Sequence, residues 1–566
     1  MMTMRKLIEC VPNFSEGVDE NIIKQITDQV EAVKGVRLID VDPGQATNRT
    51  VVTFVGEPEP VIEAAFNAIK KAQELIDMRN HKGAHPRFGA TDVCPLVPVA
   101  NISMEETVEY AHKLGKRVGE ELGIPVYAYE FAAKEEKRRS LAKCRKGEYE
   151  ANKERITSAE WKPDFGPDKW SESIAKSGVM AIGARNFLVA YNVNLNTTSV
   201  RRANSIAFDV REAGRVKREG DPVTGKKVLD ENGNPVREPG KLKKVRGIGW
   251  FIEEYGIAQI SMNLTDISVT SIHEAFDAVC ESAMERGMRV TGSELVGVVP
   301  LQAMIDAGKH YLRKQNRSTG IPDSEIIKIA VKSLGLDELY PFEANKKIIE
   351  YILEDDNPKA LVNKTLVDFA NETASESPAP GGGSIAAYMG AMGSALGTMV
   401  ANLSSHKRGW DDRWEEFSNW AEKGKHYQEA LMKKVDEDTE SFNCIMAAFQ
   451  MPKSSDEEKA ERKKAIEEAT KYATQVPFDT MKLCYESMEV AKAMAETGNP
   501  NSVTDAGVGA LAARSGVFGA FLNVKINASG LEDKAFADKL LKEGEAIKQK
   551  TIALEEEIMK IVESKM

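Results

Sequence analysis

The pattern of apolar residues changes once along this chain of 566 residues, and the change limits the possible fold more than any other feature. Up to about Leu301, short β-branched strands alternate with helical periods, whereas the rest of the chain shows helical spacing only. From Leu361 to the end the sequence is rich in Ala, Met, Glu and Lys. We therefore expect a mixed first half followed by an all-α domain.

The order of elements in the first half predicts one topology and its repetition. The first set comprises a strand at 6–11, a helix at 22–33, strands at 36–41 and 49–55, a helix at 60–78 and a strand at 93–99. This is the β-α-β-β-α-β order of ferredoxin-like folds, and a helix at 105–122 and a strand at 126–130 extend it. The order starts again with a strand at 187–195, a helix at 200–213, strands at 245–253 and 256–264, a helix at 271–286 and a strand at 288–299. The expected fold class is an α+β N-terminal half of two ferredoxin-like βαββαβ subdomains with a cleft between them, and an all-α helical C-terminal domain.

The same patterns set the expected domain boundaries. The two subdomains are assigned to residues 1–184 and 185–335, a linker to 336–360 and the helical domain to 361–566. Residues 215–244 interrupt the repeat with a hairpin-like turn between basic flanks. A solvated loop is the favoured interpretation of this insertion, and a docking site for an anionic ligand tail is the alternative.

Charge and cysteine content indicate a cytoplasmic protein whose main partner is not nucleic acid. The net charge of -11 argues against nucleic acid as the main partner. Six cysteines without CxxC spacing fit reduced thiols in a cytosol, and the N-terminus shows no signal peptide pattern. The uncharged stretch from Ser384 to Leu403 has the length of a membrane span. Because it is built from small residues, we expect a closely packed buried helix and no membrane span.

The stretch from His81 to Pro95 carries the strongest chemical signal of the first half. It sets two imidazoles, a guanidinium and a carboxylate among glycines and prolines that prevent a helix. Histidine can accept and return a proton near neutral pH, and arginine can hold a carboxylate. Zinc-ligand spacing of His81 and His85 is a weaker interpretation, because Gly83 and Pro86 disrupt a helix and no paired cysteines accompany them. No metal is therefore expected, and a structural loop stays open on these residues alone.

Two motifs in the first half resemble a known family. His85-Pro86-Arg87-Phe88-Gly89-Ala90-Thr91-Asp92-Val93-Cys94-Pro95 and Glu9-Cys10-Val11-Pro12-Asn13-Phe14-Ser15-Glu16-Gly17 are similar to motifs of glutamate formimidoyltransferase. The second half resembles formimidoyltetrahydrofolate cyclodeaminase, and the order of the halves is that of the fused bifunctional family. The resemblance implies transfer of a formimidoyl group from N-formimidoyl-L-glutamate to tetrahydrofolate. It also implies closure of 5-formimidoyltetrahydrofolate to 5,10-methenyltetrahydrofolate with loss of ammonia, as part of histidine degradation.

The resemblance also implies roles for residues of the first half. His85 is the implied catalytic acid and base, with His81 as a structural neighbour. Asp42 is a candidate to orient the imidazole or the amidinium, although an Asx turn explains it equally well. Asn48, Arg49 and Arg87 are candidates for the carboxylates of the glutamate. The family's folate-binding stretches correspond to Asp164, Phe165, Gly166, Pro167, Asp168, Lys169 and Trp170, to Gly183, Ala184 and Arg185, and to Asn192 and Asn194.

In the second half, Asp438 matches the family's catalytic aspartate. Its like-charged neighbours on a helix are expected to raise its pKa, although such a carboxylate run is more often a solvated face. Gly381, Gly382, Gly383 and Ser384 form a helix start that could bind folate through free backbone N–H groups. A second helix start that could bind folate contains Asn499, Ser502 and Asp505. Ser502 is its expected N-cap, and Asp505 would complete an arrangement similar to a capping box. Capping alone explains these last residues equally well.

The implied co-substrate is tetrahydrofolate in polyglutamylated form, with no metal. The implied assembly is a homo-oligomer, an octameric ring of dimers in relatives, for which the small-residue helices offer packing surfaces. Two alternatives stay open at this point. One is a transferase that handles formylglutamate or 5-formyltetrahydrofolate on the same scaffold, and the other is a non-catalytic folate-binding protein.

Overall fold

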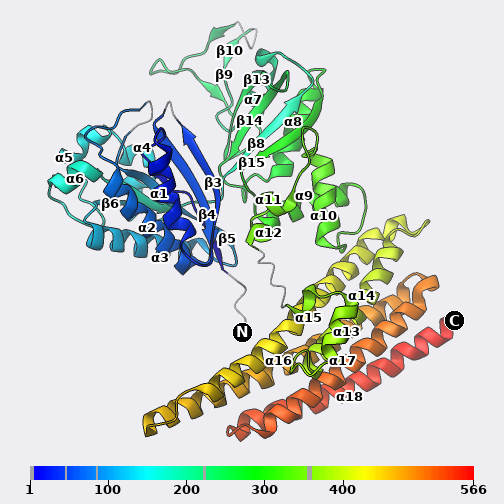
Figure 1. Cartoon of the computed structure of the whole chain (residues 1–566). Helices are drawn as coiled ribbons and strands as arrows, with labels where there is room; N and C mark the ends of the chain where they lie inside the picture. The colour runs from blue at the N-terminus through cyan, green and yellow to red at the C-terminus, as the bar shows by residue number, and fades with distance from the viewer. Residues whose placement is uncertain (1–5, 45–46, 84–86, 221–224, 354–359) are drawn as a thin grey trace. The chain divides into compact units, whose positions relative to one another are not determined.

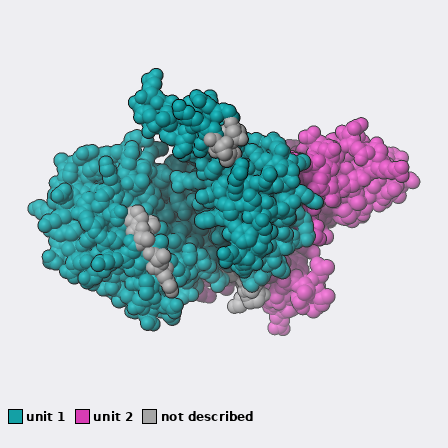
Figure 2. All heavy atoms as spheres, turned by 90° about the horizontal axis from the view of Figure 1, so that it is seen from above, with its two compact units in different colours: residues 1–307, 331–354 teal, residues 308–330, 355–566 magenta. Residues whose placement is uncertain are grey.

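The computed structural model describes residues 6–44, 47–83, 87–220, 225–353 and 360–566. It forms two compact units, shown in Figure 2. Unit 1 comprises Met1–Ala307 with Val331–Glu354, and unit 2 comprises Gly308–Ala330 with Asp355–Met566. Within unit 2, Thr319 donates its backbone N–H to Ser418 Oγ at 3.0 Å, so the short segment 308–330 belongs with the helical residues. The predicted domain boundaries stay a prediction.

The first sheet of unit 1 contains the predicted ferredoxin-like core. Its strands are β1 (Leu7–Cys10), β2 (Asn13–Phe14), β3 (Val36–Gly44), β4 (Arg49–Gly56), β5 (Thr91–Ala100), β6 (Val126–Glu130) and β7 (Met180–Ala184). β1 and β2 both lie between β4 and β5, β3 pairs with the outer side of β4, and all of these pairings are antiparallel. β7 and β6 extend the sheet in parallel beyond β5. The sheet is thus a ferredoxin-like core with two added strands.

The two faces of this sheet have different covers. The helices α1 (Glu20–Glu31), α2 (Pro58–Leu75) and α3 (Met104–Arg117) lie against one face (Figure 1) and share a core with Ile8, Cys10 and Cys94. Alternate residues of the same strands, such as Val93 and Tyr127, belong to a second core on the opposite face. That second core is completed by the segment containing η2 (Glu136–Arg138), α4 (Leu141–Cys144), η3 (Tyr149–Ala151), α5 (Asn152–Thr157) and α6 (Glu172–Ser177).

The predicted repeat is present in the second half of unit 1. β8 (Val189–Leu195), β13 (Val245–Ile252), β14 (Ile257–Leu264) and β15 (Val290–Val296) form an antiparallel sheet in the order β13-β14-β8-β15. In chain order this is second, third, first and fourth, which matches the core of the first sheet. The helices α7 (Val200–Val210) and α8 (Ile272–Met284) pack against this sheet.

The insertion after α7 forms two small ribbons. β9 (Arg215–Val216) pairs with β12 (Arg237–Glu238), and β10 (Arg218–Glu219) pairs with β11 (Lys226–Lys227). Four further helices follow the second sheet: α9 (Leu301–Lys314), α10 (Asp323–Leu334), α11 (Ala344–Lys347) and α12 (Ile349–Leu353).

Unit 2 is helical, as the sequence predicts. It contains η4 (Leu361–Asn363), α13 (Leu366–Thr373), α14 (Gly382–Ser405), η5 (Asp411–Arg413), α15 (Trp414–Gln450), α16 (Asp456–Thr497), η6 (Pro500–Ser502), α17 (Val503–Ser529) and α18 (Lys534–Lys565). The long helices run side by side in Figure 1, and α14 packs against α15, α16 and α17. A Cβ on Gly393 of α14 would lie 2.6 Å from the Gly509 carbonyl oxygen of α17, so the two backbones touch.

Two helical segments of the described chain, Gly382–Ser405 and Pro500–Ser529, are long and apolar enough to cross a membrane. Both segments pack against each other and against other helices of this unit. Close packing of helices within the unit therefore also explains why they are apolar and rich in small residues.

Candidate functional site

Asn48 holds the histidine-containing loop of the first half. Its backbone has φ +48°, in the left-handed region that Asn tolerates better than most residues. Its side-chain amide donates to the Lys82 carbonyl and accepts from the Gly17 N–H, both at 2.9 Å. Its carbonyl oxygen lies 2.9 Å from Nε2 of His81. These contacts give Asn48 a positioning role, while its predicted role toward a carboxylate stays a prediction.

The predicted catalytic histidine, His85, lies outside the described residues. The chain is described up to Gly83 and again from Arg87. Gly83 packs so closely that a Cβ there would lie 2.2 Å from the Thr47 carbonyl oxygen. The loop is therefore anchored beside Asn48 before it reaches the predicted catalytic position.

Arg87 is engaged by neighbouring parts of the protein. Its Nη1 donates to the His81 carbonyl at 2.7 Å, and its Nη2 forms an ion pair with Glu150. Its guanidinium also lies 5.5 Å from the ring centroid of Tyr149. Much of the fork predicted to hold a carboxylate of the substrate is thus occupied.

Arg49 belongs to a buried charged cluster that the sequence did not reveal. Asp92, 1% exposed, forms an ion pair with Arg145, and its Oδ2 lies 4.0 Å from Nε of Arg49. Burial raises the pKa of Asp92 to about 6, against the opposing effect of the two arginines. Burial also lowers the pKa of the Arg49 guanidinium, and the charge of Arg145 adds to that effect. Asp42, on β3, is exposed and lies across from Val51 of β4.

The predicted folate-binding loop is attached to the first sheet. Asp164 pairs with Arg138 at 2.6 Å and accepts the Ala128 N–H at 2.8 Å, and both charged side chains are almost fully buried. The Phe165 carbonyl accepts the Val126 N–H at 2.9 Å, and the amine of Lys134 lies 4.2 Å from the centroid of its ring. Further features of the loop include a left-handed backbone at Gly166, an ion pair between Asp168 and Lys162 at 2.9 Å, and an edge-on contact of Trp170 with Tyr149. Asp164 is thus fixed in the fold, and folate binding by this loop stays a prediction.

Gly183 and Ala184 lie in β7, where both pair with β6 and β5. A Cβ on Gly183 would lie 2.5 Å from the Tyr129 carbonyl oxygen, so glycine is required there. Arg185 donates its backbone N–H to the Leu96 carbonyl at 3.0 Å. Its positive charge lowers the pKa of Glu9, but complete burial dominates and raises that pKa to about 7. Glu9 stands in a motif that carried the family resemblance, although no charge pattern in the sequence predicts its burial.

Asn192 and Asn194 share one face of β8, because they are two residues apart. Asn192 donates to Glu294 at 3.1 Å. Asn194 is fully buried; it donates to Glu338 at 2.6 Å and accepts from Gln259 at 2.7 Å. The structure therefore places the two predicted asparagines on one face of the second sheet, each hydrogen-bonded to a different glutamate.

Asp438 of α15 lies against the N-terminal end of α14. Its Oδ2 accepts the Ser384 N–H at 2.8 Å and lies 3.1 Å from the Ser384 hydroxyl. A Cβ on Gly383 would lie 2.0 Å from Asp438 Oδ1, so only glycine allows this approach. Gly381 is the N-cap residue of α14, and a Cβ on Gly382 would lie 3.3 Å from the amide nitrogen of Asn523. The predicted glycine-rich helix start and the predicted catalytic aspartate therefore meet.

Burial raises the pKa of Asp438, and the two contacts with Ser384 oppose it. The expected cause, repulsion from like-charged neighbours, is wrong for this residue. Asp436 accepts the Leu361 N–H at 2.7 Å, and Glu437 pairs with Lys434 at 2.8 Å. Like charges do contribute at Glu440, where they add to a burial effect that raises its pKa.

The second predicted helix start lies at the other end of α14. Asn499 donates its backbone N–H to Ser404 Oγ at 2.8 Å. Ser384 and Ser404 are 20 residues apart on one helix, which corresponds to about 30 Å. Ser502 makes no side-chain cap for α17, so the predicted capping pair with Asp505 is wrong; Asn499 caps the short η6 turn instead. Within one chain the two predicted folate-binding helix starts are thus far apart.

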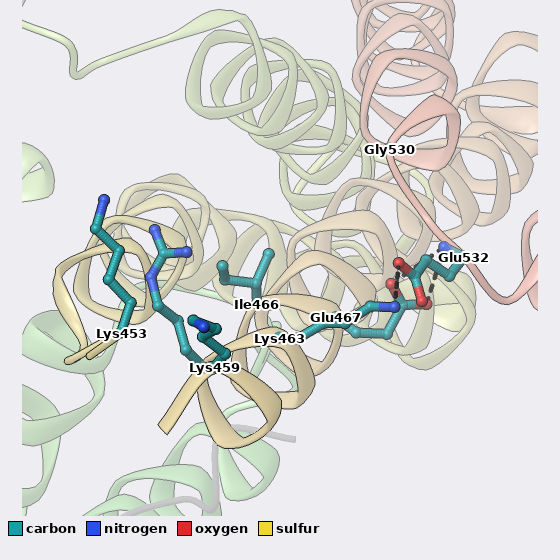
Figure 3. A pocket seen from close by; sticks show the side chains of 8 residues that line it. Lys453, Lys459, Lys463, Ile466, Glu467, Gly530 and Glu532 are labelled. Atoms are coloured by element: carbon teal, nitrogen blue, oxygen red, sulfur yellow. Dashed lines mark hydrogen bonds and ion pairs between the residues drawn. The ribbon is translucent and has the colours of Figure 1, made fainter. Parts of the chain in front are cut away.

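A separate pocket of about 320 Å³ lies in unit 2 near the ends of α15 and α17 (Figure 3). Its lining includes Lys459, Arg462 and Lys463, but each is already engaged. Lys459 pairs with Asp456 at 2.8 Å, Lys463 pairs with Glu532 at 3.0 Å, and Arg462 donates to the Phe449 carbonyl. None of the predicted site residues lines it. Among the described residues no group of three or more His, Cys, Asp or Glu side chains could hold a metal ion.

Two repeated ferredoxin-like subdomains, followed by a helical unit with a partly buried carboxyl at a glycine-rich helix start, give the chain two parts with separate candidate sites, as in a bifunctional enzyme. Family models agree with this division. The N-terminal subdomain of the formiminotransferase domain matches residues 7–185, the formiminotransferase domain matches 190–354, and formiminotransferase-cyclodeaminase matches 365–546. The chain belongs to the formimidoyltransferase-cyclodeaminase family, and the resemblance seen in the sequence is confirmed.

Curated relatives cover the whole chain and each half. Formimidoyltransferase-cyclodeaminase of Gallus gallus is 42% identical over 94% of both chains. Glutamate formimidoyltransferase of Thermoplasma acidophilum is 43% identical over 54% of this chain and 92% of its own length. Methenyltetrahydrofolate cyclohydrolase of Methylorubrum extorquens is 42% identical over 36% of this chain and 98% of its own length. The chain is therefore an enzyme with a transferase half and a cyclodeaminase-type half.

Proposed function

We propose that the first half transfers the formimidoyl group of N-formimidoyl-L-glutamate to N5 of tetrahydrofolate. We also propose that the helical half closes the product to 5,10-methenyltetrahydrofolate and releases ammonia. The supporting observation for the second step is the burial of Asp438 against Gly383 and Ser384. The supporting observation for the first step is the full match of the first half to glutamate formimidoyltransferases.

In the transfer step, N5 of tetrahydrofolate attacks the amidine carbon and its proton must be removed. The tetrahedral intermediate then expels the glutamate nitrogen, which must gain a proton. We assign both proton transfers to His85, acting as a general base and then as a general acid. Such catalysis typically accelerates a reaction about 10²- to 10⁴-fold. Arg49, Asn48, Arg87 and Asp42 remain the proposed surroundings of the substrate, and the positioning contacts of Asn48 and Arg87 hold the loop that contains His85.

In the closure step, N10 attacks the amidine carbon, and the departing nitrogen must leave as ammonia. With the amidine in its protonated amidinium form, one further proton has to move from N10 to that nitrogen, so that it leaves as ammonia and the methenyl product keeps the positive charge. We assign this transfer to Asp438. A buried carboxyl is suited to the task because burial raises its pKa toward the working pH. Gly381, Gly382, Gly383 and Ser384 would bind the folate beside it.

Folate in the first half is proposed to contact the 164–170 loop, the 183–185 segment, Asn192 and Asn194. Asn194 is buried and bonded to Gln259 and Glu338, so its proposed part is to fix the strand that carries the more exposed Asn192. The polyglutamylated form of the co-substrate and the absence of a metal are parts of the same proposal.

The test follows the absorbance of methenyltetrahydrofolate after the protein is mixed with N-formimidoyl-glutamate and tetrahydrofolate. His85→Ala should abolish transfer and leave closure of supplied 5-formimidoyltetrahydrofolate intact, whereas Asp438→Asn should do the reverse. Loss of both activities in either folded variant would contradict the assignment to two sites.

Assays on the same protein preparation also test two related activities. Competition between N-formyl- and N-formimidoyl-glutamate would reveal a formyl transferase. The cyclohydrolase relative of the helical half supports hydrolysis of the methenyl group as a second candidate. In that case the methenyl absorbance would decay faster with protein than without it.

We further propose a cytoplasmic homo-oligomer, with a ring of dimers as the fuller form. All six cysteines are free thiols, which fits a reducing compartment. Exposed apolar residues form one stripe on α14 and one on α17: Met392, Met399, Leu403, Val508, Leu511, Leu522 and Ile526. A symmetric pairing of two copies through these stripes would cover them, and an antiparallel pairing would bring the Asp438 end of one α14 toward the Asn499 end of the other. A plain monomer in mass photometry would exclude this assembly.

A further inference from the structure

The cluster of Arg49, Asp92 and Arg145 has more positive than negative charge among the residues that the structure describes. Asp92 Oδ2 is bonded to Arg145 Nη2, and Arg49 Nε is 4.0 Å from the same oxygen. One carboxylate thus faces two guanidinium groups. The side chains of Arg49 and Arg145 are 23% and 15% exposed, so the cluster is reachable from outside, whereas that of Asp92 is 1% exposed.

Three buried polar atoms of this cluster lack a hydrogen-bond partner among the described residues. They are Arg49 Nε, Asp92 Oδ1 and Arg145 Nε. Buried donors of charged groups are normally paired, because an unpaired one costs free energy. Because these Nε atoms are buried, a ligand would meet the partly exposed remainder of the two guanidinium groups, beside a positive charge that Asp92 alone does not balance.

The place of the cluster in the fold connects it to the transferase loop. Arg49 directly follows Asn48, which bonds to Lys82, and Asp92 lies on β5 after the loop ends. Arg145 is the C-cap residue of α4, in the segment that covers the second face of the sheet. The guanidinium of Arg87, in contrast, is already paired with Glu150 and the His81 carbonyl.

We propose that Arg49 and Arg145 together bind one carboxylate of N-formimidoyl-glutamate, with Asp92 as the positioning residue that aligns the two guanidinium groups. This inference rests on the proposed transferase function and replaces Arg87 by Arg145 as the second arginine. A guanidinium matches a carboxylate in shape and charge, and a ligand carboxylate would bring the cluster to neutrality. Arg87, already paired with Glu150 and the His81 carbonyl, then stays among the proposed surroundings of the substrate without holding this carboxylate.

The experiment compares N-formimidoyl-L-glutamate with its two monoamides, in which either the α- or the γ-carboxylate is a neutral carboxamide. The wild-type chain should discriminate against one amide by about 10- to 100-fold in kcat/KM, as expected for a charge-assisted hydrogen bond in a buried site. Arg145→Gln should lower kcat/KM for the parent substrate by a similar factor and remove the discrimination against that amide only. Arg145→Lys keeps the positive charge but lacks the two-pronged guanidinium. Its kcat/KM for the parent substrate should lie between those of the wild-type chain and Arg145→Gln.

Arg139→Gln is the matched control, because the side chain of Arg139 is 54% exposed and forms an ion pair with the exposed Glu136. It should behave as wild type toward all three substrates. Thermal melting checks the folding of each variant, and Arg145→Lys serves where Arg145→Gln is unstable.

A purely structural role for Arg145 would lower activity toward all three substrates equally, and unchanged ratios would overturn the inference. Equal turnover of the parent and both amides by the wild-type chain would overturn it as well. A wild-type chain that converts none of them would instead refute the proposed transferase function.

Discussion

The contact between Gly383 and Asp438 leads to a sharp prediction for the helical half. In Gly383→Ala, the new Cβ would lie 2.0 Å from Asp438 Oδ1, 2.6 Å from Oδ2 and 2.5 Å from the carboxyl carbon. The carboxyl group must therefore move by about 1 Å or more to reach an ordinary contact distance. A displacement of about 1 Å typically costs about 10²-fold in rate. We expect kcat for closure of 5-formimidoyltetrahydrofolate to fall by about two orders of magnitude.

Stability and activity should separate in this variant. Position 383 lies in the first turn of α14, where alanine has a helix preference up to about 1 kcal/mol better than glycine. The displaced Asp438 loses its bonds to Ser384, worth about 1.5 to 3 kcal/mol for a charged group, so the net effect on unfolding is small or moderate. Closure is followed by methenyltetrahydrofolate absorbance, with transfer activity measured in the same preparation.

Gly530→Ala is the control for this experiment. Gly530 is the C-cap residue of α17, with a negative φ of −82°, and a Cβ there would make only an ordinary 3.6 Å contact with the Asn527 carbonyl oxygen. It should keep both activities. Full closure activity in Gly383→Ala would refute the reasoning, because it would show that Asp438 need not stay against the start of α14.

Three further predictions concern the first half. Burial raises the pKa of Glu9 from its ordinary value of 4.5 to about 7, so between these pH values the folded chain holds a proton on Glu9 that the unfolded chain has lost. The free energy of unfolding should therefore fall as pH rises from about 4.5 to about 7, by up to about 3 kcal/mol. Glu9→Gln should flatten this pH dependence of the unfolding free energy, and an unchanged slope would contradict the assignment. Arg138→Met should lower the free energy of unfolding in urea by about 3 to 5 kcal/mol, because it leaves Asp164 buried and unpaired. Lys162→Met removes the exposed ion pair with Asp168 and should lower it by less than about 1 kcal/mol. Asn48→Ala should slow transfer more than Asn48→Gly. Both variants lose the same side-chain hydrogen bonds, but alanine adds about 1 to 3 kcal/mol of backbone strain at φ +48°. Equal transfer rates in the two variants would show that the backbone conformation is unimportant.

The periodicity of apolar residues predicted the order of both sheets' main elements, because it reports which face of a strand or helix is buried. It missed β2, which has only two residues, and β7, whose Met180–Ala184 sequence is built largely from small residues. β2 is too short to show an alternation. β7 is as long as the predicted β6 but lacks the aromatic residues that mark β6 as a strand. Their pairing partners, which decide the strand assignment, come from distant parts of the chain.

The candidate site was predictable only where a motif is local in sequence. The meeting of Gly383, Ser384 and Asp438 follows from two motifs that the family resemblance identified separately. Arg145 stood in a charged, irregular stretch, and nothing in that stretch shows that it reaches Asp92, 53 residues earlier. Ser502 failed as a cap because its backbone, at φ −119° and ψ 16°, lacks the extended conformation that an N-cap residue usually adopts.

The electrostatic surroundings of the two proposed sites differ in the way the two reactions require. The transferase substrate carries two negative carboxylates, and the cluster of Arg49 and Arg145 has an unmet positive charge beside the loop of the predicted histidine. The closure reaction releases neutral ammonia, so its site needs a movable proton more than a fixed charge. Asp438 meets that need because burial, acting against the bonds from Ser384, raises its pKa. Exchanging these surroundings would impair both reactions. Two arginines beside the carboxyl would oppose the effect of burial on its pKa, as they do at Asp92, and an uncharged helix end would not hold a dicarboxylate.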